Sequence, residues 1–270
     1  MTGEREHERW IVRESGPPDA DHAVLLLPGA LCTAPFFDDL LEHPKLTGES
    51  IRFVATTLQG FGGTPAPDDL SIENDARLAG KLAADFGCDA VVGHSLGGNV
   101  AIEMVAAGEF SGPVALLAPS FSREDEFKEL AMLDRIGRVP GVGHLAWAVM
   151  LRTIGSGVKD DFPGERHEAL VAEMKKNDPG FCRRKVRRYF EYLDRHGSLV
   201  PRLCDSGVKA WVVFGERDDV GLKDDERRGL EECPPVTMVW IPDAGHFTLN
   251  EEPGRIADLV LELVSSGTPA

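Results

Sequence analysis

The chain has 270 residues, of which 42% are hydrophobic and 27% are charged, and its formal net charge is −16. This length and balance fit one large globular domain, or one domain with an insertion. The negative charge repels nucleic-acid phosphates and anionic membranes, so we expect neither as a partner. No uninterrupted apolar run approaches the roughly 20 residues of a membrane span.

The cysteines and histidines are scattered along the chain rather than clustered. There is no C-x-x-C pair among the five cysteines, which favours reduced thiols in a cytoplasmic protein. A metal site needs clustered ligands, so we expect no metal. The first 20 residues are charged and lack the apolar core of a secretory signal. The cysteines are Cys32, Cys88, Cys182, Cys204 and Cys233.

Strand and helix patterns alternate through the first 121 residues. The apolar runs that precede each Gly- or Pro-containing loop read as buried strands, and the segments between them have helical spacing. Ser71 is a predicted N-cap, with Glu73 and Asp75 in the first turn of its helix. This alternation predicts a mostly parallel sheet covered on both faces. The predicted strands lie within 22–30, 50–58, 88–94 and 112–120, and the helices within 33–43, 71–86 and 96–105.

The alternation stops after Ser120 and resumes near the end of the chain. Residues 122–205 contain helical patterns and loops without a convincing strand. Strands are predicted again within 208–219 and 236–247, followed by a closing helix with Pro253 near its start, where proline is tolerated. We therefore expect an α/β core made of residues 1–121 and 206–270, with an inserted helical unit at 122–205.

Ser95 lies in the stretch "VVGHSLGGNV", which matches G-x-S-x-G between a predicted strand and a predicted helix. A sharp strand-to-helix turn needs small flanking residues and leaves the serine hydroxyl exposed above the strand ends. The free N–H groups of the following helix point at the same place. This context favours a nucleophile over the alternative, an ordinary turn serine.

A serine hydroxyl needs a base at neutral pH, and the base needs a carboxylate that orients it. His246 follows the last predicted strand and is the candidate base. Asp218 follows the strand before it, with Asp219 as the neighbouring rival. The order Ser, Asp, His is the one expected for a nucleophile placed on such a turn. His94 is too close to Ser95 in sequence to act as its base, and we interpret it as structural.

An oxyanion hole would complete this chemistry. The backbone N–H of Leu96, the residue after the nucleophile, is one candidate donor. The loop "LLLPGALC" supplies the second, with Ala30 as the predicted donor and Leu31 as the alternative. A simple turn is the structural alternative for this loop.

Two other segments are considered for ligand binding. The glycine-rich "GFGGT" at 60–64 lacks the Gly-Lys-Ser/Thr of a phosphate-binding loop, so we expect no nucleotide there. The basic run "RRKVRRYFEYLDR" at 183–195 reads either as a solvated helix face or as a docking site for an acidic carrier protein.

Together these residues resemble the α/β-hydrolase fold superfamily, specifically its lid-bearing, esterase-like branch. The resemblance covers nearly the whole chain and implies a mostly parallel sheet of about eight strands, with 122–205 as a helical cap over the site. Two loops depart from the family pattern: Pro28-Gly29 replaces the common His-Gly, and Gly60-Phe61-Gly62 replaces Gly-His-Gly. The motifs that carry the resemblance are Pro28 to Ala30, Gly60 to Thr64, Gly93 to Gly98, Gly215 to Asp218 and Ala244 to Phe247.

The first hypothesis for function is a serine hydrolase that cleaves a small-molecule carboxylic ester through an acyl-enzyme, without a cofactor. A thioesterase or acyltransferase acting on carrier-bound acyl groups is the second. A lyase, cyclase or perhydrolase, or a receptor that keeps the triad, is the third. Apolar side chains in 122–205 favour a substrate with apolar bulk. The candidate pocket residues are Leu31, His144, Trp147, Met150, Leu151 and Phe162.

Overall fold

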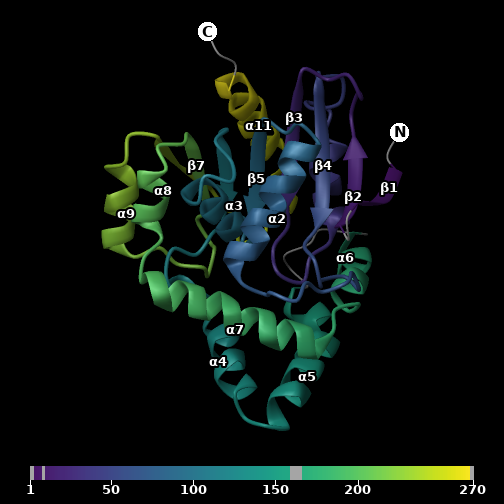
Figure 1. Ribbon diagram of the computed structural model, residues 1–270, viewed down its shortest axis with the longest axis vertical. Helices are drawn as coiled ribbons and strands as arrows, with labels where there is room; N and C mark the ends of the chain where they lie inside the picture. The colour runs from purple at the N-terminus through teal and green to yellow at the C-terminus, as the bar shows by residue number, and fades with distance from the viewer. Residues whose placement is uncertain (1–2, 8–9, 159–165, 268–270) are drawn as a thin grey trace.

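A computed structural model describes residues 3–7, 10–158 and 166–267, and an eight-stranded sheet lies at its centre (Figure 1). The strand order is β1-β2-β4-β3-β5-β6-β7-β8. β3 to β8 run parallel to one another, which confirms the predicted α/β class. The strands are β1 (Gly3–His7), β2 (Trp10–Ser15), β3 (His22–Leu27), β4 (Ile51–Thr57), β5 (Ala90–His94), β6 (Val114–Leu117), β7 (Ala210–Gly215) and β8 (Val236–Ile241).

The two N-terminal strands are absent from the sequence prediction. β1 pairs antiparallel with β2, and β2 pairs antiparallel with β4, so they extend one edge of the parallel sheet. In β2, Trp10 and Val12 are buried while their neighbours are more exposed. Such a half-buried antiparallel strand has a short pattern with charged residues instead of the continuous apolar run that identifies β3 or β5.

Helices cover both faces of the sheet, and the strands divide their side chains between them. Leu25 and Leu27 of β3 pack in one cluster with α2 (Ile72–Asp85) and α3 (Leu96–Ala106), which lie in front of the sheet in Figure 1. Val24 and Leu26 pack in the other cluster with η1, α1, α10 and α11. This alternation follows from the two-residue period of a strand. These four elements are η1 (Ala34–Phe37), α1 (Asp38–Leu41), α10 (Thr248–Glu251) and α11 (Pro253–Gly267).

Helices fill the chain between β6 and β7, and no strand occurs among the described residues of 122–205. In Figure 1, α4, α5 and α7 lie below the sheet, beyond the ends of its parallel strands. The elements of this helical segment are η2 (Arg123–Asp125), α4 (Lys128–Gly137), α5 (Val142–Gly157), α6 (Arg166–Met174), α7 (Pro179–His196) and α8 (Val200–Asp205).

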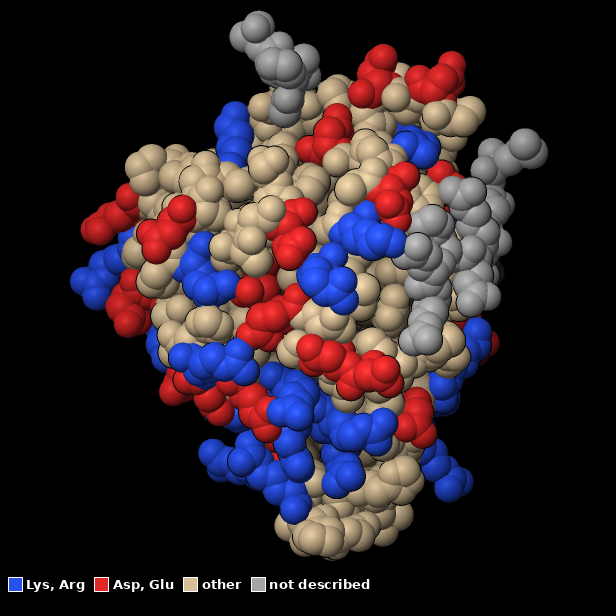
Figure 2. Space-filling model, viewed as in Figure 1, with Lys and Arg blue, Asp and Glu red and all other residues tan. Residues whose placement is uncertain are grey.

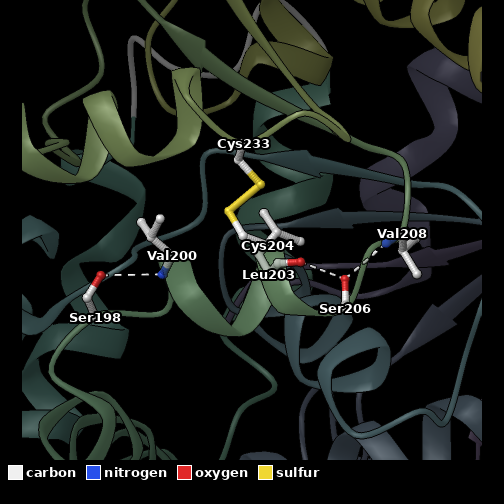
Figure 3. Close-up of a disulfide and its surroundings, with 7 residues drawn as sticks. All are labelled: Ser198, Val200, Leu203, Cys204, Ser206, Val208 and Cys233. Carbon is white, nitrogen blue, oxygen red and sulfur yellow. Dashed lines mark hydrogen bonds between the residues drawn. A yellow bond between two sulfur atoms is a disulfide. The ribbon is translucent and has the colours of Figure 1, made fainter.

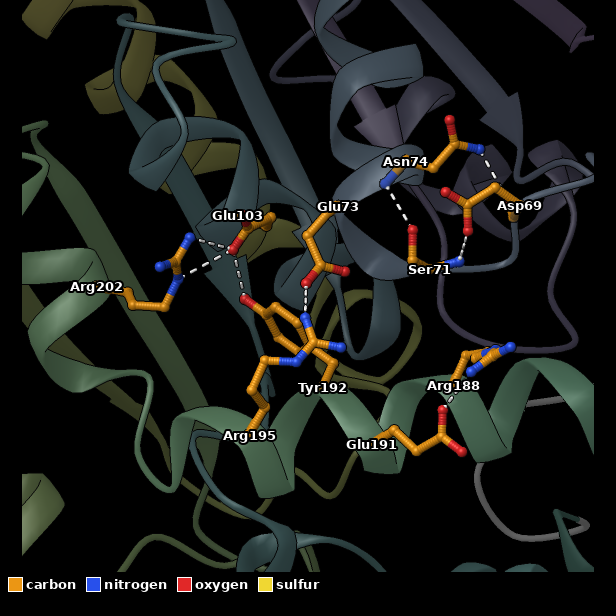
Figure 4. A network of polar contacts seen from close by, with 10 residues as sticks. All are labelled: Asp69, Ser71, Glu73, Asn74, Glu103, Arg188, Glu191, Tyr192, Arg195 and Arg202. Atoms are coloured by element: carbon orange, nitrogen blue, oxygen red, sulfur yellow. Dashed lines mark hydrogen bonds and ion pairs between the residues drawn. The ribbon is translucent and has the colours of Figure 1, made fainter.

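Polar contacts join α7 to the helices that cover the front of the sheet. The buried Lys185 ammonium forms an ion pair with the buried Asp75 of α2 and donates to the Leu70 carbonyl at 3.0 Å. Farther along α7, the Tyr192 hydroxyl donates to the Glu103 carboxylate of α3 at 2.8 Å (Figure 4). A buried charge needs such a partner, so α7 is held in one position against the core.

A disulfide corrects the prediction that all five cysteines are reduced. Cys204 of α8 is bonded to Cys233, which follows α9 (Asp224–Glu231), and the two Cα atoms are 5.9 Å apart (Figure 3). The two residues are 29 positions apart in sequence, and only the packing of α8 beside α9 brings them together. Neither sits in a motif, so spacing alone carried no signal. The other three cysteines are free thiols.

None of the helices in the part of the chain that the structure describes combines the length and the apolar character needed to cross a membrane.

Candidate active site

Ser95 occupies the turn between β5 and α3 in a backbone conformation that side-chain-bearing residues seldom adopt. Its φ is +49° and its ψ is −120°. A Cβ on Gly93 would lie 2.4 Å from the Gly97 carbonyl oxygen, and a Cβ on Gly97 would lie 2.2 Å from the Leu27 carbonyl oxygen. The two glycines are therefore required for this turn to close, and the turn holds Ser95 at the carboxyl edge of the sheet.

His246 and Asp218 meet at the same edge, from the loops that follow β8 and β7. His246 Nδ1 lies 3.1 Å from both Asp218 carboxylate oxygens. A carboxylate only accepts hydrogen bonds, so Nδ1 carries the proton and Nε2 of the neutral ring is left as an acceptor. The Asp218 side chain is 1% exposed, whereas the rival Asp219 is exposed and makes no such contact among the described residues.

His94 supports the loop that carries His246. Its Nε2–H donates to the His246 backbone carbonyl at 3.0 Å. Burial, together with the nearby His246, lowers the pKa of His94 to about 3, so the ring stays neutral at physiological pH. A neutral, fully buried ring is suited to a structural position rather than to proton exchange.

The loop after β3 faces Ser95 from the neighbouring strand. Gly29, Ala30 and Leu31 line the same cavity as Ser95 and Leu96, the first residue of α3. Leu31 has a φ of +69°, and its carbonyl accepts a hydrogen bond from the Asn177 side chain at 2.9 Å. A residue of the helical segment thus fixes the loop from which the second oxyanion donor is predicted.

A largely apolar cavity of about 390 Å³ extends from Ser95 and His246 into the helical segment. Of the predicted pocket residues, Leu31, Trp147 and Met150 line it. His144 lies one helical turn before Trp147, is exposed and is not part of the lining. Leu151 is buried in the core and is not part of the lining either. Phe162 lies outside the described residues.

Several lining residues went unnoticed in the sequence. They come from the start of the helical segment and from α7 and include Glu126, Phe127 and Tyr189. The Phe127 ring packs edge-on against the His246 ring, with centroids 4.8 Å apart. Glu126 stands in the charged run "SREDEFKEL" and Tyr189 in a basic run, and both runs resemble solvated helix surface. The only sequence signal for this region is the end of the strand and helix alternation after Ser120, which indicates an inserted segment but not which of its residues line the cavity.

Within the described residues, no group of three or more His, Cys, Asp or Glu side chains is arranged to hold a metal ion.

Residues 24–259 match the model of the alpha/beta hydrolase family. The chain belongs to this family. The match spans both parts of the sheet and the helical segment between them, so the alpha/beta hydrolase fold accounts for the whole arrangement around Ser95. No curated sequence matches the chain.

Solved structures extend the likeness to the level of the fold. The esterase EaEST from Exiguobacterium antarcticum is 14% identical, with a TM-score of 0.75 over 95% of each chain. A thermophilic esterase from Thermogutta terrifontis is 19% identical, with a TM-score of 0.71 over 96% of this chain and 94% of that one. The thioesterase domain from the curacin biosynthetic pathway is 14% identical, with a TM-score of 0.72 over 97% and 99%. At these identities the likeness concerns the fold and not the substrate.

Proposed function

We propose that this alpha/beta hydrolase cleaves carboxylic esters through a covalent acyl-enzyme. The observation that carries the proposal is the strained Ser95 turn together with a histidine whose Nδ1 is bound to Asp218, with Ser95 and His246 both lining one apolar cavity. A nucleophile, a base and a residue that orients the base are the three parts that acyl transfer requires.

In the proposed reaction, Ser95 Oγ attacks the acyl carbon while His246 Nε2 takes its proton. Asp218 keeps the imidazole in the required tautomer and stabilises the imidazolium. The N–H groups of Leu96 and Ala30 receive the negative charge that develops on the carbonyl oxygen. His246 then protonates the leaving alcohol and activates the water that releases the acid.

The cavity favours an acyl group with apolar bulk, enclosed by residues 122–205 acting as a cap. Its walls above Ser95 are formed by Leu130, Leu133, Met150, Ile154 and Val186, and its volume of about 390 Å³ is in the range of small-molecule sites. The cycle needs no cofactor, since every group that moves a proton belongs to the chain.

The test is a series of initial rates on nitrophenyl esters of increasing acyl length, with the wild type, Ser95→Ala and His246→Ala. We expect a loss of at least about a thousandfold in kcat for both variants. His144→Ala is the matched control, because this histidine is exposed outside the cavity, and it should retain wild-type rates. A folded wild type without turnover, whose Ser95 resists a fluorophosphonate probe, contradicts the proposal.

A second candidate is a thioesterase or acyltransferase that takes its acyl group from an acidic carrier protein. The observation that favours it is the accumulation of Lys and Arg over α7, below the sheet, in a protein of net charge −16 (Figure 2). Several cations of this run are engaged internally. Arg188 pairs with Glu191 and Arg195 with Glu73 (Figure 4), and Lys185 pairs with Asp75.

Arg184 remains for a carrier, since it is exposed and has no hydrogen-bond or ion-pair partner among the described residues. Arg187 is half-buried, and its Nε and Nη2 atoms are inaccessible to a carrier. Charge reversal in Arg184→Glu should weaken turnover of a carrier-bound thioester several-fold and leave nitrophenyl esters unaffected. Equal loss on both kinds of substrate contradicts carrier docking.

A further inference from the structure

Glu126 places a buried carboxylate in the wall of the cavity that holds Ser95 and His246. The residue is 8% exposed and lines the cavity at the start of the helical segment. No Lys, Arg or His nitrogen of the described residues forms an ion pair with it. An unpaired carboxylate in an apolar wall is costly, and the Ser-His-Asp chemistry does not use it.

Three neutral donors bind this carboxylate and leave part of it free. Oε2 accepts hydrogen bonds from the Tyr189 hydroxyl at 2.8 Å and the Ser120 hydroxyl at 3.1 Å. Oε1 accepts one from the Phe127 backbone N–H at 3.0 Å. A carboxylate has about four acceptor positions, so Oε1 retains one for a further donor.

This acceptor lies close to the reacting groups on two sides. Phe127, the next residue, packs its ring against the His246 imidazole. On the other side, the Tyr189 hydroxyl is 3.2 Å from Asn99 Oδ1, and the Asn99 backbone N–H donates to the Ser95 carbonyl one helical turn earlier. Glu126 thus shares the cavity lining with Ser95 and His246 and is linked to both through its neighbours.

The charged side chains around the cavity leave Glu126 without a counter-ion among the described lining residues. Glu129, three residues later, also lines the cavity. Lys185 is the one Lys or Arg in the described lining, and its ammonium is bound to Asp75 and to the Leu70 carbonyl. No cation of the described lining is thus free to compensate Glu126, so a second carboxylate entering the cavity meets repulsion and a donor meets attraction.

We propose that Glu126 is a specificity-determining residue: it binds a hydroxyl or amide N–H group on the acyl part of the substrate and excludes acyl chains that end in a carboxylate. The inference rests on the proposed function, because it takes the cavity as the acyl site. A site that binds a hydrogen-bond donor of the substrate discriminates against an analogue without that donor, because the buried acceptor, here the Glu126 carboxylate, is then left without a partner.

The alternative is that the Glu126 network only holds the helical segment against α3. A purely structural group affects all substrates alike, whereas a specificity group changes their ratio. Glu126→Gln separates the two. The amide keeps the size of the side chain and an oxygen for Tyr189, but it removes the charge and presents an NH₂ donor in place of Oε1.

The experiment compares kcat/KM for matched nitrophenyl esters: an unsubstituted acyl chain, the same chain with a hydroxyl or an internal amide, and the same chain ending in a carboxylate. We expect the wild type to prefer the donor-bearing ester over the unsubstituted one by about tenfold or more. Glu126→Gln should abolish this preference, leave the unsubstituted ester within about twofold and raise the rate on the carboxylate ester several-fold. Glu129→Gln, a carboxylate of the same lining that is exposed, should keep the donor preference.

Equal wild-type rates on the matched esters overturn the inference, as does an equal loss on all of them in Glu126→Gln. If the wild type hydrolyses none of the esters, the proposed function fails. The inference is then decided by titration calorimetry on Ser95→Ala. The ligands are the acyl chain that bears a hydroxyl or an internal amide and the unsubstituted chain, and equal affinities for them reject the inference. Where Glu126→Gln lacks a cooperative unfolding transition, Glu126→Asp replaces it: the carboxylate retreats by one methylene, so the donor preference should fall while the carboxylate ester stays excluded.

Discussion

The sheet core and the helical segment at 122–205 differ in charge, packing and the part of the site that each supplies. The segment has 16 of the 29 Lys and Arg residues but only 14 of the 45 Asp and Glu, so its formal charge is +2 while the rest of the chain carries −18. Figure 2 shows this concentration of positive charge below the sheet. The core contributes Ser95, Asp218 and His246 from loops at one sheet edge, and the segment contributes most of the cavity wall.

The sheet core also buries its apolar side chains more completely than the helical segment does. Strands β3 to β7 of the core are covered by helices on both faces and bury their apolar side chains almost completely. Of the large apolar side chains that are exposed in the described residues, all but Trp240 belong to α4, α5 or the turn between them: Met132, Val139, Val142, Leu145 and Val149. We expect the core to fix the reacting atoms of the proposed reaction and the helical segment to determine which substrates reach them. The predictions below test this division, beginning with the largest effect.

Asp218→Asn should remove most of the proposed activity without touching the helical segment. The amide places an NH₂ or a differently oriented oxygen against His246 Nδ1 and favours the wrong tautomer, so we expect kcat to fall by about a thousandfold or more on every ester. Asp219→Asn is the matched control, because this neighbour is exposed and should keep wild-type rates. Stopped-flow or steady-state rates decide it, and a similar loss in both variants would point to a disturbed loop instead.

Lys185→Met tests the junction between the two regions. It leaves Asp75 buried without its cation, and breaking one half of such a pair costs about 3–5 kcal/mol of unfolding free energy. The double variant Lys185→Met, Asp75→Leu should recover most of this loss, since two apolar side chains replace the pair. Urea unfolding measures the free energy of unfolding of the single and the double variant. A double variant as unstable as the single one would mean that packing, and not the unpaired charge, sets the cost.

The sequence predicted the core far better than the segment. The continuous apolar runs of β3, β5 and β6, and the glycines around Ser95, each follow from local rules: a strand buried on both faces, or a turn with no room for a Cβ. Asp218 and His246 were located because they follow strands whose carboxyl ends share an edge. The choice of Asp218 over Asp219 agrees with the contact to His246, although its role in catalysis stays a prediction.

The structure of the helical segment and of the first two strands depends on tertiary contacts that cannot be predicted from the local sequence pattern. β2 escaped prediction because it is only half buried and so lacks a continuous apolar run, and β1 is paired with it at the edge of the sheet. The Cys204–Cys233 bond depends on the packing of α8 beside α9. Glu126 and Lys185 look like solvated charges in the sequence and become buried only when α7 and the start of the segment pack against the core. Which face of a short amphipathic helix meets a cavity is decided by its tertiary neighbours.

Met150→Trp tests whether the segment sets acyl length. Met150 lies on the cavity face of α5 with Trp147 and Ile154, and a larger ring there shortens the space above Ser95. We expect kcat/KM to fall by about tenfold for long acyl esters and to remain within about twofold for acetyl esters. Leu145→Trp is the control, because Leu145 is exposed on the same helix and lies outside the lining. An equal loss of kcat/KM for all acyl lengths would mean that the substitution disturbs the core and not the space for the acyl chain.

The smallest effect concerns stability, at a pair of carboxyl groups shared by the two regions. Glu226 of α9, in the core, is buried beside Asp125 of the segment, and burial together with hydrogen bonding to Asp125 raises its pKa from 4.5 to about 7. Asp125 holds its own place through hydrogen bonds from the backbone N–H groups of Phe121 and Ser122. Lys223 and Ser198 act in the opposite direction and lower the pKa of Glu226.

Glu226→Gln should therefore change how stability depends on pH. Between pH 4.5 and about 7 the folded wild type keeps a proton on Glu226 that the unfolded chain releases, so its unfolding free energy falls as pH rises through this window and levels off above it. The amide of the variant stays neutral throughout, so the variant should match the wild type near the lower end of the window. At about one pH unit above the lower end of the window it should be more stable by about 1.4 kcal/mol, because each pH unit between the two pKa values costs the wild type about 1.4 kcal/mol.

Thermal unfolding of both proteins across this window measures the difference, with Glu232→Gln, exposed at the end of the same helix, as control. The control should follow the wild-type curve, since an exposed carboxyl group gains little from folding in either protonation state. Parallel curves for Glu226→Gln and the wild type would show that the junction tolerates an ionised pair. The two regions would then be less tightly packed there than the burial of both carboxyl groups indicates.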